Sequence, residues 1–324
     1  MEINLSCIKE EMALFQEAFE KVLQTRVPMA DSVIRYFLDR RGKQLRPALT
    51  LLTSKLVSGK VTHKGICGAV AVELLHNASL MHDDVVDNCG ERRGADTINK
   101  VWDNRVAVLT GDFFLSKCML TSNSVGSMQI NNVLGGIVTA LAEGELEQLS
   151  NASTLHLSEE TYFSVIKGKT ASLFSACLEI GALSADAAPE QVKILAEVGE
   201  KIGLIYQIRD DIFDYFPETA EIGKPTGHDM MEGKVTLPLL YALMNAPEEE
   251  SSRMKAILQS EQGIGKEQAA TLSAFAIRHG GIEYAKTKMS SMAEEAKEKL
   301  NLFPDNEYKA VLCQIIDYFV RREY

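Results

Sequence analysis

Residues 73–94 read ELLHNASLMHDDVVDNCGERRG. The stretch begins with apolar residues at the 3.6-residue period of a helix and then places three carboxylates, Asp83, Asp84 and Asp87. Residues four apart on a helix share one face, with Cβ atoms roughly 5–6 Å apart, so Asp83 and Asp87 are expected to point together. Asp84 is expected to point to one side. Like charges this close are costly unless a cation neutralises them, so the stretch predicts a helix that ends in a cation site.

The same spacing returns far downstream, where residues 206–215 read YQIRDDIFDY and place Asp210, Asp211 and Asp214. Aspartate fills 15 of 324 positions. By composition alone, a DDxxD pattern is expected about 0.03 times per chain, and two copies on the order of once in two thousand chains. Apolar residues flank both motifs, unlike a solvated acidic face. We therefore predict that the motifs face each other across a cavity and hold Mg²⁺, which takes oxygen ligands and bridges carboxylates to a diphosphate.

Basic residues beside glycine are suited to bind the phosphate groups. Such residues follow the first motif, precede a predicted helix, lie in the small-residue segment IKGKTASLF and bracket the longest predicted loop, 217–233. In that order they are Arg92 and Arg93; Lys43 and Arg46, next to Gly42; Lys167 and Lys169; and Lys224 and Lys234. Each one alone is more often a solvated surface charge. As a set they indicate anion binding at helix entrances and loops, where backbone N–H groups are free.

The composition is that of a globular protein with a substantial core. Hydrophobic residues make up 46% of the chain and charged residues 24%, and the net charge of −11 disfavours nucleic acid as a partner. The six cysteines form no CxxC pair, which favours reduced thiols in the cytoplasm over a disulfide framework. The N-terminus lacks the pattern of a signal peptide, and no apolar run approaches the ~20 residues that span a bilayer. We expect a cytoplasmic protein without a transmembrane segment.

Helical periodicity runs through nearly the whole chain, and no segment alternates strictly as a strand would. We therefore predict one all-α domain over residues 1–324, a helical bundle around a central cavity. Three details depend on local signals. We predict one helix over about 100–120, and another over about 154–181 with Ser158 and Thr161 as possible starts and Gly181 as its natural stop. We also predict an irregular loop over 217–233.

Seven segments, in this order, resemble the trans-isoprenyl (polyprenyl) diphosphate synthases over nearly the whole chain. They are GKQLRP, ELLHNASLMHDDVVDNCGERRG, AVLTGDFFL, GELEQL, IKGKTASLF, YQIRDDIFDY and GKPTGHDMMEGKVTLPLL. Arg41 and Asp103 depart from the family pattern at positions where glycine is usual, and neither departure touches the aspartates. The resemblance implies an isoprenoid synthase fold and an enzyme that condenses isopentenyl diphosphate head-to-tail with an allylic diphosphate.

The resemblance also assigns roles to residues of this chain. It implies three Mg²⁺ ions held by Asp83, Asp84, Asp87, Asp210, Asp211 and Asp214. The allylic diphosphate would be bound by Arg92, Lys169, Thr170, Gln207, Lys224 and Lys234, and the isopentenyl diphosphate by Gly42, Lys43, Arg46, His76 and Arg93. The residues that carry catalysis would be Asp83, Asp84, Lys169, Asp210 and Lys224.

The resemblance implies that product length depends on the side chains one turn before the first motif, because the growing chain of family members is expected to run down between helices from that motif. Ala78 and Ser79 are both small and leave the path open. The sequence looks most like the bacterial long-chain enzymes of the octaprenyl, solanesyl and decaprenyl type, which make the side chain of a respiratory quinone. We expect an octaprenyl to decaprenyl product from farnesyl diphosphate, with the floor of the tunnel around residues 134–138.

Other readings of the sequence remain. A short-chain farnesyl or geranylgeranyl diphosphate synthase is disfavoured by Ala78 and Ser79. A class I terpene cyclase is disfavoured by the intact second DDxxD motif, and a non-catalytic subunit of a heteromeric synthase by the presence of all six aspartates. The remaining alternative is a non-enzymatic helical binding protein in which both motifs are incidental acidic faces. The family resemblance implies a homodimer, and we expect a transient membrane contact when the product leaves.

Overall fold

The computed structural model describes residues 3–40, 42–92, 94–151, 157–216, 227–260 and 263–322, and within these ranges the chain is almost entirely helical. The N-terminal half contains η1 (Ser6–Ile8), α1 (Lys9–Val22), α2 (Pro28–Leu38), α3 (Leu45–Ser58), α4 (His63–Val86), α5 (Ile98–Val101), α6 (Asn104–Ser124) and α7 (Met128–Asn151). The remainder contains α8 (Glu159–Ile166), η2 (Lys167–Ala171), α9 (Ser172–Ser184), α10 (Pro189–Phe213), α11 (His228–Met231), α12 (Leu237–Asn245), α13 (Glu248–Leu258), α14 (Lys266–Arg278), α15 (Gly281–Leu300) and α16 (Glu307–Arg321). A two-residue hairpin, β1 (Glu91–Arg92) with β2 (Ala95–Asp96), follows α4. The predicted all-α bundle is confirmed.

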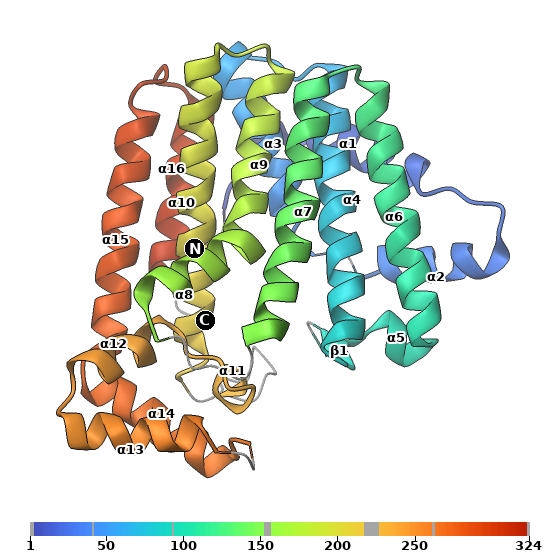
Figure 1. Ribbon diagram of the computed structural model, residues 1–324. Coiled ribbons are helices and arrows are strands. Elements are labelled where there is room, and N and C mark those ends of the chain that lie inside the picture. Colours follow the sequence, from blue (N-terminus) through green and yellow to red (C-terminus); the bar gives the residue numbers. More distant parts are fainter. Residues whose placement is uncertain are drawn as a thin grey trace.

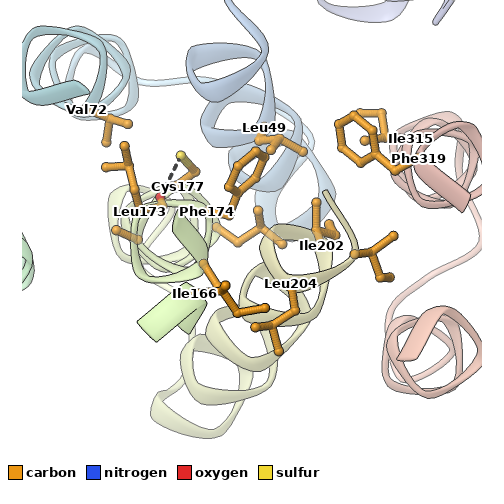
Figure 2. Close-up of a cluster of buried hydrophobic side chains, with 14 of the residues drawn as sticks. Leu49, Val72, Ile166, Leu173, Phe174, Cys177, Ile202, Leu204, Ile315 and Phe319 are labelled. Atoms are coloured by element: carbon orange, nitrogen blue, oxygen red, sulfur yellow. Dashed lines mark hydrogen bonds between the residues drawn. The ribbon is translucent and has the colours of Figure 1, made fainter. Parts of the chain in front are cut away.

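Helix α4 lies at the centre of the bundle, beside α3, α6 and α9 (Figure 1). Every residue from Gly65 to Ala78 is buried, which explains why this helix is apolar on all sides rather than along one stripe. In the neighbouring layer, Phe174 of α9 lies among Leu49 of α3, Ile202 of α10 and Phe319 of α16 (Figure 2). No helix in the described ranges is both long enough and apolar enough to cross a membrane.

Glycines on α10 bring this helix unusually close to its neighbours. A Cβ atom on Gly199 would lie 2.6 Å from the carbonyl oxygen of Phe174, and one on Gly203 would lie 2.5 Å from Cα of Ala171. Both distances are below van der Waals contact, so only glycine fits at either position. The consequence is that η2 and the start of α9 are held directly against α10.

Two of the predicted helices are divided in the structure. The prediction of one helix over 100–120 is wrong, because α5 ends at Val101 and α6 starts at Asn104. Asp103 between them is extended and caps α6, its carboxylate accepting a hydrogen bond from the Val106 amide at 2.9 Å. The segment predicted over 154–181 is likewise divided into α8, η2 and α9. Residue 154 lies outside the described ranges.

Gly181 does not terminate a helix, contrary to the prediction, because α9 continues to Ser184. A Cβ atom on Gly181 would lie 2.5 Å from the carbonyl oxygen of Thr50, so this glycine serves the close packing of α9 on α3. The loop predicted over 217–233 is also wrong in part, since α11 occupies residues 228–231. Residues 217–226 of that loop lie outside the described ranges.

Helices α4 and α10, which carry the two aspartate motifs, run in the same direction through the bundle and end on the same side of it (Figure 1). The end of α7 and the short helix α11 lie on this side too (Figure 1). The fold therefore gathers at one end of the bundle four segments that are far apart in the sequence.

Candidate active site

The first aspartate motif forms the end of α4. Asp83 and Asp84 lie in its last turn, and Asp87 is the C-cap, whose amide donates to the Asp83 carbonyl at 2.8 Å. Burial raises the pKa of Asp83 to about 6, with Lys169 opposing the shift and Glu145 adding to it. Asp83 therefore lies within electrostatic reach of a basic residue from η2 and an acidic residue from α7.

Asp84 is buried and is held by the hairpin that follows the helix. Nε and Nη2 of Arg92 each lie 2.7 Å from Oδ1 of Asp84, and the Asn99 side chain donates to the Asp84 carbonyl at 3.1 Å. Burial raises the pKa of Asp84 although Arg92 opposes the shift. As the spacing predicts, Asp84 has partners that differ from those of Asp83.

Asp84 and Arg92 line a cavity of about 330 Å³ behind the first motif. Its wall also includes Tyr36 and Phe37 of α2, Arg40 and Gly42 after that helix, residues of α4, and the segment from β2 to Ile98. Gly42, predicted to bind isopentenyl diphosphate, and Arg92, predicted to bind the allylic diphosphate, thus line the same cavity.

The second motif forms the end of α10, with Asp210 and Asp211 in its last turns and Asp214 as the C-cap. Asp211 is only 3% exposed, and both of its carboxylate oxygens accept hydrogen bonds. The Tyr162 hydroxyl donates to Oδ2 at 2.6 Å, and the Gln207 amide donates to Oδ1 at 2.8 Å. Burial raises the pKa of Asp211 to about 7, while these two hydrogen bonds oppose the shift.

Asp210 and Asp214 have different partners from Asp211. Oδ1 of Asp210 lies 3.6 Å from Nη1 of Arg322, which follows the last helix of the chain. Oδ2 of Asp214 accepts a hydrogen bond from the backbone amide of Asp229 at 3.1 Å, which ties α11 to the end of α10. In both motifs the middle aspartate is the buried one, whereas the other two aspartates are partly or fully exposed.

Two lysines lie close to the first motif and are connected to the second through neighbouring residues. Lys169 lies in η2, a π-helical turn of the kind that often occurs at functional sites, and its Nζ atom is 2.5 Å from Oε1 of Glu145. Next to it, the Thr170 hydroxyl donates to the Gln207 side-chain oxygen at 2.7 Å. This places the Lys169 turn between Asp83 on one side and the second motif on the other.

Lys234 makes the second link. Its Nζ atom lies 2.6 Å from Glu232 and 3.9 Å from Asp229, the residue whose amide holds Asp214. Burial opposes the charge of Lys234, but nearby carboxylates, that of Asp87 in the first motif among them, raise its pKa overall. The structure thus brings the two motifs, Lys169 and Lys234 into one site.

The residues predicted to bind isopentenyl diphosphate lie near the start of α3. Nη1 of Arg46 is 3.0 Å from Nε2 of the buried His76, and its guanidinium carbon is 4.8 Å from the centre of the Phe174 ring. Nε of Arg46 is buried and has no hydrogen-bond partner among the described residues. Gly42 and Lys43 are exposed beside it. Arg93 of this set, and Lys224 of the allylic set, lie outside the described residues.

The donor chemistry of this site fits Mg²⁺. Among the described residues, no group of three His, Cys, Asp or Glu side chains could enclose a cation without help. Mg²⁺ rarely uses such a closed cage: it typically binds one or two carboxylates, keeps several waters and takes its remaining ligands from a substrate phosphate. Asp83 with Asp87, and Asp210 with Asp214, offer carboxylates for this kind of shared coordination.

Several residues of the site were not predicted from the sequence. Glu145 lies in the matching segment GELEQL but received no role, and Asp229 lies in the last matching segment. Tyr162 and Arg322 carry no sequence signal, because an aromatic residue on a helix and an arginine at a chain end are both ordinary. Their roles depend on tertiary contacts.

The comparisons with known proteins agree on one family. The polyprenyl synthetase family model matches residues 27–275. The chain is similar to an octaprenyl diphosphate synthase of Haemophilus influenzae, with 32% identity over 93% of this chain and 91% of that protein. It is also similar to the solved structure of a polyprenyl synthase from Caulobacter crescentus complexed with calcium and isoprenyl diphosphate. The TM-score is 0.89, with 31% identity over 99% of both chains.

A relative with a shorter product is similar to the same degree. A geranylgeranyl pyrophosphate synthase from Bacteroides thetaiotaomicron has a TM-score of 0.83 and 38% identity, over 98% of this chain and 99% of that one. The family is therefore established over most of the chain, whereas relatives with different products are about equally similar. The chain belongs to the polyprenyl synthetase family, the Mg²⁺-dependent trans-isoprenyl diphosphate synthases, and is a prenyltransferase.

Proposed function

We propose that this protein is an all-trans long-chain polyprenyl diphosphate synthase, formed by one domain over residues 1–324. It adds isopentenyl diphosphate units to farnesyl diphosphate and makes an octaprenyl to decaprenyl diphosphate for a respiratory quinone. The observation that carries the proposal is that the helices of both DDxxD motifs end on the same side of the bundle, with Lys169 near Asp83 and Lys234 near Asp87.

The allylic diphosphate binds between the motifs. Asp83, Asp84, Asp87, Asp210, Asp211 and Asp214 would hold three Mg²⁺ ions there. When bound, these ions supply Lewis acidity that stabilises the departing diphosphate. Lys169 and Lys234 add positive charge, together with Lys224 and Arg92. Thr170 and Gln207 orient this end of the site through their mutual hydrogen bond.

Isopentenyl diphosphate binds near the start of α3, where Gly42, Lys43, Arg46, His76 and Arg93 form the second anion site. The buried Nε of Arg46, which has no partner among the described residues, supports this assignment, because an unpaired guanidinium N–H suits a phosphate oxygen.

The condensation joins the two substrates at the first motif. The allylic C–O bond breaks, the double bond of isopentenyl diphosphate forms the new C–C bond, and a proton passes to the released diphosphate. The protein holds both reactants in position and excludes water, which would otherwise trap the carbocation. The buried apolar face of α4 next to the motif provides the dry surface for the growing chain.

Two observations favour a long product. Ala78 is 2% exposed, and the small Ser79 points its hydroxyl back to the His76 carbonyl, so neither places a bulky group one turn before the motif. Leu134 and Ile137 of α7 are buried within the segment predicted as the tunnel floor. The alternative is a short-chain synthase, which the similarity to a geranylgeranyl pyrophosphate synthase favours.

Product analysis tests this proposal. The protein is incubated with isopentenyl diphosphate, Mg²⁺ and, in separate reactions, geranyl or farnesyl diphosphate, with a chelator in the control. We expect extension of farnesyl diphosphate to one dominant chain of eight to ten isoprene units. A product that stops at farnesyl or geranylgeranyl diphosphate would establish the short-chain alternative. No condensation by the pure chain would favour a subunit of a heteromeric synthase.

We also infer a homodimer, and the surface of α6 supports it. Its outward side carries Leu109, Met119 and Leu120, which are 67%, 53% and 65% exposed. Large apolar side chains left exposed on one helix of a folded protein favour a second copy as their partner. Sedimentation analysis should give a dimer that Leu109→Glu weakens, whereas Leu302→Glu, at an equally exposed leucine after α15, leaves it intact.

We place the protein in the cytoplasm, with a transient membrane contact when its apolar product leaves. All six cysteines are free thiols in the structure, which supports a reducing compartment. Cell fractionation should recover the protein in the cytosolic fraction. Vesicles should accelerate product release in steady-state assays, and an unchanged rate would remove the membrane contact.

A further inference from the structure

We propose that Tyr162 is a positioning residue of the prenyl transfer site. Its hydroxyl begins a chain of hydrogen bonds through Asp211 and Gln207 to Thr170. This chain fixes the Lys169 turn relative to the second aspartate motif. The inference rests on the proposed function, since it assumes that a metal-bound diphosphate occupies the site between the motifs.

The first contact of the chain joins α8 to α10. The Tyr162 hydroxyl lies 2.6 Å from Oδ2 of Asp211, and both residues are buried, with exposures of 8% and 3%. A hydrogen bond from a buried hydroxyl to a carboxylate is among the stronger kinds, and it fixes the rotation of the carboxylate plane. Tyr162 therefore determines where the remaining oxygen of Asp211 points.

The next two hydrogen bonds of the chain are made by the side-chain amide of Gln207. The amide nitrogen of Gln207 donates a hydrogen bond to Oδ1 of Asp211 at 2.8 Å. The amide oxygen therefore faces the other way and accepts a hydrogen bond from the Thr170 hydroxyl at 2.7 Å. An amide that donates at one end and accepts at the other connects the orientation of Asp211 to the Thr170 side chain of η2. Lys169 immediately precedes Thr170 in that turn, forms an ion pair with Glu145 and acts electrostatically on Asp83.

The far end of the same turn is held by packing. Gly203 allows Ala171, the last residue of η2, to lie directly against α10. Packing at Ala171 sets how far η2 stands from α10, while the hydrogen bond at Thr170 sets its rotation. Loss of the Tyr162 hydroxyl removes a restraint on the rotation and leaves the packing in place.

The protein also contains a residue suited to a matched control variant. Tyr284 of α15 donates to Oε2 of Glu159, the first residue of α8, at 2.5 Å. This second tyrosine–carboxylate hydrogen bond tethers the same helix α8 but does not reach either aspartate motif. A variant at Tyr284 therefore measures how a less firmly held α8 affects diphosphate binding and activity. This effect is separate from that of losing the hydrogen bond to Asp211.

The experiment compares Tyr162→Phe with Tyr284→Phe by calorimetric titration with inorganic diphosphate in the presence of Mg²⁺, together with steady-state kinetics. Tyr162→Phe should weaken diphosphate binding about tenfold and raise the Mg²⁺ concentration for half-maximal activity by a similar factor, as expected for one buried hydrogen bond to a charged group. Tyr284→Phe should stay within about twofold of wild type in both measurements. Equal effects of the two variants, or unchanged binding in Tyr162→Phe, would overturn the inference.

A double variant guards against a simple folding defect. Thr170→Val removes the other end of the chain, and the variant that combines it with Tyr162→Phe should bind diphosphate no more weakly than the worse single variant. Additive losses would show two independent contacts and contradict a chain. If wild type condenses substrates but Tyr162→Phe binds diphosphate normally, the inference fails alone. If wild type neither binds Mg²⁺ with diphosphate nor forms product, the proposed function fails as well.

Discussion

The Nζ atom of Lys169 lies 2.5 Å from Oε1 of Glu145, so a lysine from the π-helical turn η2 meets a glutamate from α7 beside the first aspartate motif. Lys169 and Glu145 act on the pKa of Asp83 in opposite directions. A diphosphate that binds to Lys169 has to compete with Glu145. The ion pair therefore holds the lysine at the site and also limits its affinity for substrate.

Glu145→Gln should strengthen the binding of inorganic diphosphate at a fixed Mg²⁺ concentration. Both side chains are partly exposed, so a gain of about two- to fivefold is expected. Isothermal titration measures it. The control is Glu200→Gln, which removes the partner of Lys167 in the same turn, 3.0 Å away, and should leave binding unchanged. Weaker binding in Glu145→Gln would mean that the glutamate aids substrate binding.

The stability of the metal-free protein should depend on pH through Asp211 and Asp83. Folding raises the pKa of Asp211 from 3.8 to about 7 and that of Asp83 from 3.8 to about 6. Between pH 3.8 and about 7 the folded state therefore binds more protons than the unfolded state. Stability from these groups is therefore present at low pH and is lost as pH rises through the window. Urea unfolding at pH 5.5 and 7.5 should show a smaller pH effect in Asp211→Asn than in wild type. Equal pH effects on the stability of the two proteins would contradict a raised pKa of Asp211 in the folded state.

The same protonation should oppose metal binding. Protons compete with Mg²⁺ for carboxylates, so the affinity for Mg²⁺ with diphosphate should fall as pH drops from 8 to 5.5. Titration at several pH values measures this dependence.

Ala78→Phe should shorten the product, because an aromatic ring one turn before Asp83 would block the path of the growing chain. Ala78 is 2% exposed, so a thermal unfolding curve must first show that the variant folds. Ser290→Phe, which adds the same group to the exposed face of α15, should leave product length unchanged. An unaltered length distribution in a folded Ala78→Phe would place the tunnel along another face of α4.

Gly203→Ala should destabilise the fold by about 1–3 kcal/mol, since the new methyl group would lie 2.5 Å from Cα of Ala171 and force η2 away from α10. The variant should also lower turnover by moving Lys169. Gly135→Ala on α7 has open space around the new methyl group and should raise stability by up to about 1 kcal/mol through helix propensity. Chemical unfolding measures both, and equal effects would contradict the tight contact.

Much of this architecture follows from the sequence. The apolar period of α4 and the DDxxD spacing predict both the helix and the divergence of Asp84 from Asp83. The break before α6 was missed because the capping role of Asp103 is visible only once the chain turns there. Gly181 was misread because a helix stop and a close helix contact use the same residue type.

In the candidate site, too, some residues could be predicted from the sequence and others could not. Carboxylates at a fixed spacing can be recognised in one segment, whereas Tyr162 and Glu145 act through contacts with residues 49 and 24 positions away. No local pattern identifies such partners, because their role is created by the packing of α8 and α7 on the motifs. The positions of Arg93 and Lys224 stay predictions of the sequence.

The most direct test of the central claim is a condensation assay with separate substitutions in the two motifs. Wild type, Asp83→Asn, Asp210→Asn and the exposed control Asp186→Asn are incubated with farnesyl diphosphate, isopentenyl diphosphate and a range of Mg²⁺ concentrations. If the motifs jointly hold the metal-bound diphosphate, each motif variant should lose at least about a hundredfold in turnover, the scale for removing one group that stabilises transition-state charge, while it keeps its fold. Asp186→Asn should match wild type. Near-normal turnover in Asp83→Asn or Asp210→Asn would contradict the account.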